Sequence, residues 1–95
     1  MTNYTVRIEL HSSLYAPDFE TLHREMRNEG FGRTITSGSG IIYHLPRGEY
    51  NRSTTEGRSE VLSAAERAVA ATGKTAEVLV TESAGRVWSG LSEVK

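Results

Sequence analysis

The chain has 95 residues, a formal net charge of −1 and no cysteine, which predicts one domain over residues 1–95 and excludes disulfides and thiolate metal sites. The near-neutral charge disfavours non-specific binding to duplex DNA, and the three histidines follow no metal-ligand spacing, so we expect neither a metal nor a cofactor. No apolar run approaches the ~20 residues of a membrane span and the N-terminus lacks a signal-peptide layout, which together predict a cytoplasmic protein.

The first predicted elements are a strand and a helix. Apolar side chains alternate with polar ones along residues 4–11, at Tyr4, Val6, Ile8 and Leu10. This period of two predicts a strand with one buried face. A helix is predicted over residues 17–29, because Pro17 suits a first helical turn and Gly30 suits the position just after a helix end.

The next segment predicts a hairpin followed by a long connection. β-Branched and aromatic residues fill 31–36 and 40–45, and a glycine-containing turn separates them. Pro46 ends the second of these strands, since it has no N–H to give to a ladder. Residues 46–57 are then interpreted as a loop whose length exceeds the usual connection, as functional loops often do.

The last third of the chain predicts one more helix, one more strand and a tail. An apolar stripe at helical spacing indicates a helix that Gly73 ends. A strand is predicted over residues 75–81. The tail, about residues 84–95, is expected to fold back onto the sheet or a helix edge through Trp88 and Leu91.

The order of these elements predicts an α+β, ferredoxin-like βαββαβ fold, with a four-stranded antiparallel-rich sheet and two helices on one face. In the usual strand order 4-1-3-2, the third strand lies beside the first. His11 and His44 would then be near neighbours on the uncovered face, while Tyr4 and Tyr43 would face the helices. Because these aromatic rings are turned inward, the sheet does not resemble an RNA-recognition module that stacks bases on its first and third strands.

Two apolar residues, Ile42 and Leu79, are also expected on the uncovered face. They are either ordinary surface residues or part of a homodimer contact, formed face to face or edge to edge. The sequence alone leaves both interpretations open.

The candidate catalytic residues are the histidines, because the chain lacks the motifs of nucleophile elbows and phosphate-binding loops. His11, His23 and His44 are the groups that titrate near neutrality, so any general acid or base would come from them. Cleavage of RNA without a metal requires only proton transfer around the 2′-hydroxyl and a cation near the phosphate. A solvated or structural role is the alternative for each histidine.

The candidate RNA-binding residues are Arg33, Arg47, Tyr50 and Arg52. Arginine for phosphate and tyrosine for a stacked base is the composition of a single-strand contact. Nine of the eleven basic residues are arginine, which either favours phosphate recognition or reflects compositional bias. As an alternative, Tyr50 folds back to cap the edge of the core.

Four segments of the chain resemble a known family. They are YTVRIELH (4–11), LHREMRNEGFGRTI (22–35), YHLPRGEYN (43–51) and VLVTESAGRVWSGL (78–91). Together they look like the small bacterial GhoS-like antitoxins of type V toxin–antitoxin systems. The resemblance implies a ferredoxin-like domain related to the small CRISPR-associated ribonucleases, with endoribonuclease activity on the messenger RNA of the toxin. Those nucleases keep an aspartate for a metal at the end of the first strand, where this chain has His11 and Ser12, so a metal-independent mechanism is expected.

Two functional hypotheses follow. The first is an RNA-directed antitoxin that acts on single-stranded toxin mRNA through the residues named above, with or without cleavage. The second is a non-enzymatic protein-binding adaptor or inhibitor, encoded on a phage or other mobile element, that uses its open sheet face or an edge strand.

Overall fold

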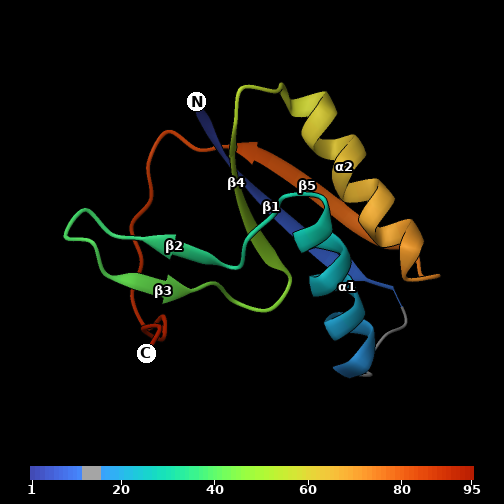
Figure 1. The fold of residues 1–95 in the computed structure, drawn as a ribbon, viewed down its shortest axis with the longest axis horizontal. Helices are drawn as coiled ribbons and strands as arrows, with labels where there is room; N and C mark the ends of the chain where they lie inside the picture. The colour runs from blue at the N-terminus through green and yellow to red at the C-terminus, as the bar shows by residue number, and fades with distance from the viewer. Residues whose placement is uncertain (12–15) are drawn as a thin grey trace.

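In the computed structural model, which describes residues 1–11 and 16–95, the chain forms an antiparallel sheet, two helices and a separate hairpin. The elements in chain order are β1 (Thr2–Leu10), α1 (Ala16–Asn28), β2 (Thr34–Thr36), β3 (Ile42–His44), β4 (Glu49–Thr54), α2 (Arg58–Ala71) and β5 (Ala76–Glu82). The sheet has the order β4-β1-β5, and both helices lie on one face of it, while the β2–β3 hairpin projects to the side (Figure 1).

The alternation predicted for the first strand is confirmed in β1. Tyr4, Val6, Ile8 and Leu10 are all buried, and Arg7 and Glu9 between them are exposed. The buried face of β1 meets the apolar stripes of the two helices, which contribute residues such as Leu22, Met26 and Val61 to one core. Burial of each larger side chain contributes roughly 1.5–3 kcal/mol, so this interface fixes which face of the sheet the helices cover.

The helix expected over residues 17–29 is confirmed as α1, and Gly30 follows it as predicted. Gly30 has a φ of +94°, a conformation that a Cβ disfavours. A Cβ there would also lie 1.7 Å from Nη1 of Arg52, which donates a 2.8 Å hydrogen bond to the carbonyl oxygen of Glu29. Glycine is therefore required both by the backbone and by the arginine that caps the end of the helix.

The long loop expected over residues 46–57 is wrong, because its central half forms the strand β4. This strand pairs antiparallel with β1 from Thr2↔Thr54 to Arg7↔Glu49. Its start depends on Gly48, whose φ is +90° and where a Cβ would lie 2.6 Å from the carbonyl oxygen of Ile8. The sequence did not indicate the strand because only one of its residues is strongly apolar.

The predicted pairing of the third strand with the first is consequently wrong. β3 pairs with β2 in a hairpin of its own, and β4 takes the place beside β1. Before the hairpin begins, Gly32 and Asn51 exchange two 2.8 Å backbone hydrogen bonds along the outer edge of β4. The order βαβββαβ is therefore roughly ferredoxin-like, with an additional hairpin inserted after this short bridge.

The tail folds back, but Trp88 packs on the hairpin rather than on the sheet or a helix edge as predicted. Trp88 packs edge-on against Tyr43, with 5.4 Å between ring centroids, and the N–H of His44 donates a 2.8 Å bond to the carbonyl oxygen of Ser92. Arg86 crosses the uncovered face of the sheet and donates to Thr5 of β1 and to Asn51 of β4. The tail thus ties the hairpin to the sheet.

Over residues 1–11 and 16–95, no helix is long and apolar enough to cross a membrane. The same residues contain no group of three or more histidine, cysteine, aspartate or glutamate side chains placed to hold a metal ion.

Candidate anion-binding site at His23

The structure brings four of the seven predicted site residues together. His23 lies on α1, Arg33 immediately precedes β2, Arg47 precedes β4, and Tyr50 is in β4. His23 contacts Tyr50 directly, and the charges of Arg33 and Arg47 both act on its imidazole. Three separate parts of the chain therefore converge on one histidine.

The centre of the site is the hydrogen bond between His23 and Tyr50. Nδ1 of His23 lies 2.5 Å from the phenolic oxygen of Tyr50, and the ring centroids are 5.7 Å apart. Tyr50 points inward from β4 and is fully buried, whereas His23 lies at the boundary of the apolar stripe of α1 and is partly buried. One edge of the imidazole is thus fixed by the core and the other remains near the surface.

Both groups favour their neutral forms. Burial, followed by the positive charges of Arg33 and Arg47, lowers the pKa of His23 to about 4. Burial raises the pKa of Tyr50 above its ordinary value, so the phenol keeps its proton at neutral pH. When the phenol donates to Nδ1, the imidazole carries its own proton on Nε2 and presents it as a donor; in the other tautomer Nδ1–H donates to the phenol.

Three arginines surround the histidine and form what we call the arginine cluster: Arg27, Arg33 and Arg47. Within the part of the chain that the structure describes, none of them forms an ion pair with a carboxylate, although Arg24, Arg52, Arg58 and Arg67 each do. The guanidinium of Arg47 instead stacks over the ring of Phe19, 4.1 Å from its centroid. Unpaired guanidinium groups around one point make the local potential positive although the whole chain carries a charge of −1.

A cavity of about 350 Å³ opens beside His23, between the outer face of α1 and the segment that leads to β2. It is lined by Glu20, His23, Arg27, Phe31, Gly32 and Arg33. Two members of the arginine cluster therefore line the cavity, and Glu20 is the carboxylate that faces them.

Two of the predicted RNA-binding residues are engaged inside the fold. Tyr50 is 0% exposed, so its ring offers no surface on which a base could stack. Arg52 points under the helices, where it donates to the carbonyl oxygen of Glu29 and at 2.7 Å to Oε1 of Glu56. The predicted single-strand contact of this segment is therefore reduced to Arg47, because the segment is a strand rather than a loop.

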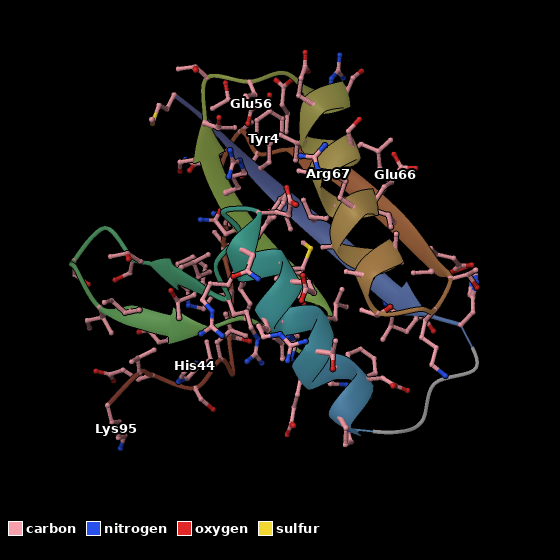
Figure 2. All side chains as sticks on the ribbon, turned by 45° about the vertical axis from the view of Figure 1, so that its right-hand side comes forward. Tyr4, His44, Glu56, Glu66, Arg67 and Lys95 are labelled. Carbon is pink, nitrogen blue, oxygen red and sulfur yellow. The ribbon has the colours of Figure 1, made fainter. Side chains whose placement is uncertain are left out.

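The expected pair of His11 and His44 does not form. His11 immediately follows β1, where its Nδ1 lies 3.1 Å from Oγ1 of Thr75 and its Nε2 lies 3.9 Å from Oε2 of Glu77. His44 is in β3 on the hairpin, beside the C-terminal tail (Figure 2). The proximity was expected on the assumption that β3 pairs with β1, and β4 occupies that position instead.

One member of the arginine cluster was not predicted from the sequence. Arg27 follows His23 by four residues and Glu20 precedes it by three, so all three side chains share one face of α1. The helical spacing could have indicated this grouping. The contribution of Arg47, by contrast, depends on the turn before β4.

No protein-family model matches the chain, and no curated protein matches it in sequence.

Proposed function

We propose that this protein is an RNA-directed, antitoxin-like protein of the GhoS-like kind that binds single-stranded RNA through the arginine cluster. The observation that carries the proposal is that Arg27 and Arg33 line one cavity beside His23, that the charge of Arg47 also acts on this histidine, and that none of the three arginines forms an ion pair with a carboxylate among the described residues. Mutual repulsion of the three cations is relieved when an anion binds between them. Arginine suits phosphate in particular, because its planar fork donates two parallel hydrogen bonds.

We also propose that the fold is a variant of the ferredoxin-like fold. The Gly32–Asn51 bridge supports it, since this bridge stands where the second strand of such a sheet would pair. The two helices on one face of the sheet and the last strand, β5, beside β1 agree with such a fold (Figure 1).

The geometry favours binding over cleavage. Acid and base catalysis of RNA cleavage needs two groups that exchange protons near neutrality. His23 is the candidate histidine that lies among the arginines, and a pKa of about 4 makes it a weak base and leaves it almost without an acidic proton at pH 7. We therefore infer that the protein acts on its target messenger RNA by binding to it and not by cleaving it.

The test is a titration of a labelled single-stranded RNA, followed by fluorescence anisotropy at several salt concentrations. Three phosphate contacts predict a slope of about −2 in log K against log salt concentration, since each contributes about −0.7 on single strands. Arg33→Ala is expected to weaken binding and to reduce the slope by about 0.7.

Arg24→Ala is the matched control. Arg24 also lies on α1, but it points about 100° away from His23 around the helix and pairs with Glu25. It should leave both affinity and slope unchanged. If the two alanine variants behave alike, the cluster is not the RNA contact. Site-specific cleavage of a labelled transcript in EDTA, lost in His23→Asn, would show instead that the protein is a nuclease.

A second candidate function is supported by exposed apolar residues at two separate places. Leu79 is 64% exposed on β5, which is an edge strand of the sheet, and Ile42 is 43% exposed on the β2–β3 hairpin. The expectation that both lie on the uncovered sheet face is therefore wrong for Ile42. These features favour a non-enzymatic adaptor or a homodimer that uses the uncovered sheet face or the β5 edge. A pull-down that still recovers a bound protein after nuclease treatment would favour the adaptor. Gel filtration at micromolar concentration would show whether the chain elutes as a dimer or as a monomer.

A further inference from the structure

The charges around the cavity indicate what kind of anion it fits. Arg27, Arg33 and the flanking Arg47 bring three positive charges, and Glu20 brings one negative charge. The histidine is neutral at pH 7, so the formal charge of the site is +2. An internal phosphodiester of RNA carries a single negative charge, whereas a terminal phosphate monoester carries about −1.5 to −2 at neutral pH.

The free edge of His23 adds a directional donor to this site. Nδ1 is engaged by the buried phenol of Tyr50, and the cavity lies on the side of α1 that His23 shares with Glu20 and Arg27. With the phenol donating to Nδ1, Nε2 carries a proton that can be donated to an anionic oxygen. An anion in the cavity selects this tautomer, because the other one would turn a lone pair towards the anion.

We propose that the cavity beside His23 binds a dianionic phosphate monoester, the 5′-phosphate at the end of an RNA strand. Arg27 and Arg33 donate to its oxygens from opposite walls of the cavity, and Nε2–H of His23 donates from the side of the core. The inference rests on the proposed RNA binding and adds to it the class of strand that is preferred.

Binding of such a group is coupled to the protonation of His23. The groups that face the imidazole are Glu20 and Arg27 on α1, Arg33 before β2, and Arg47 and Tyr50 on the β4 side. Negative charge in the cavity offsets the two arginines that hold the pKa of His23 low, so the pKa should rise when the anion is bound. A histidine with a purely structural role would not respond in this way.

The main experiment compares two oligonucleotides of identical sequence, labelled at the 3′ end, that carry either a 5′-phosphate or a 5′-hydroxyl. The phosphorylated strand should bind about tenfold more tightly, which is the value of one additional charge-assisted hydrogen bond. This preference should disappear in Arg27→Ala and in Arg33→Ala and persist in Arg24→Ala, with folding of each variant verified by circular dichroism.

The outcomes separate this inference from the proposed function. Equal affinity for the two strands overturns the 5′-phosphate preference and leaves RNA binding in place, whereas no binding of either strand overturns both. A preference that survives in Arg27→Ala and Arg33→Ala places the terminal phosphate elsewhere and refutes this cavity as its site.

Inorganic sulfate, which stays a dianion in mild acid, provides an independent readout that needs no RNA. The titration of the His23 imidazole, followed by nuclear magnetic resonance, should move upward from about pH 4 when sulfate replaces chloride at equal ionic strength. An unchanged midpoint for His23 contradicts binding of a dianion in the cavity.

Discussion

The partly buried imidazole of His23 should make the protein sensitive to mild acid. In the unfolded chain, histidine takes up a proton as the pH falls through its ordinary pKa of about 6.5. In the folded protein, burial and the nearby Arg33 and Arg47 hold the pKa at about 4. Because the unfolded state binds more protons between these two values, the free energy of unfolding decreases as the pH falls from about 6.5 to about 4, and His23 has no such effect above pH 7.

The size of this effect follows from the two pKa values. The full difference of about 2.5 pH units would remove about 3 kcal/mol of stability between pH 7 and pH 4. The imidazole is partly exposed, and solvent screening reduces the expected loss to roughly 1.5 kcal/mol. Such a loss is large for a small domain whose total stability is on the order of 5–15 kcal/mol.

The assay is urea unfolding followed by far-ultraviolet circular dichroism at a series of pH values, for the natural chain and for His23→Asn. Asparagine keeps a polar atom near the position of Nδ1 but takes up no proton, so the titration of carboxylates cancels in the difference between the two proteins. The stability of the natural chain relative to His23→Asn should fall by roughly 1.5 kcal/mol from pH 7 to pH 4. His44→Asn, on the exposed hairpin, is the matched control. A difference that stays constant over this range refutes the reasoning.

Three further predictions concern the scaffold. Gly73→Ala should cost about 1 kcal/mol, and Gly30→Ala should destabilise the protein by more than that. Both glycines have a positive φ, but a Cβ on Gly30 meets Arg52 while one on Gly73 meets open space. Equal losses of stability in urea unfolding would show that the contact with Arg52 adds no steric cost. Arg52→Met should cost about 1–3 kcal/mol by leaving the carbonyl oxygen of Glu29, just after α1, without this donor, and unchanged stability would contradict that capping role. Truncation after Ser83 should lower Tm by at least about 4 °C, and an unchanged Tm would show that the tail contributes nothing.

The sequence by itself determined the elements whose own residues carry a clear pattern. Alternation in β1, the apolar stripe and final glycine of α1, and the stripe of α2 each depend on residues close together in the chain. The positions of the buried and exposed residues of β1 follow directly from that local pattern, because successive side chains of a strand point to opposite faces. The general α+β class follows from the order of these elements.

Only the tertiary structure decided the identity and place of β4. Its inward positions hold Tyr50, Arg52 and Thr54. An arginine turned towards a core needs partners for most of its donors, and both terminal nitrogens of Arg52 have them while its Nε is buried without one. Here the partners are the end of α1 and Glu56, and the first of these is remote in sequence. A local pattern cannot anticipate them, so the strand was interpreted as an exposed loop.

The candidate site was likewise predicted in part by the sequence and in part decided by the tertiary structure. The sequence indicated His23, Arg33 and Arg47 as residues capable of the chemistry, and helical spacing would have added Arg27. The hydrogen bond between Tyr50 and His23 and the convergence of the arginines arise because β4 pairs with β1 beneath α1. Residue types can thus be read from the chain, but the lowered pKa and the shared cavity depend on burial and long-range contact, which only the folded arrangement supplies.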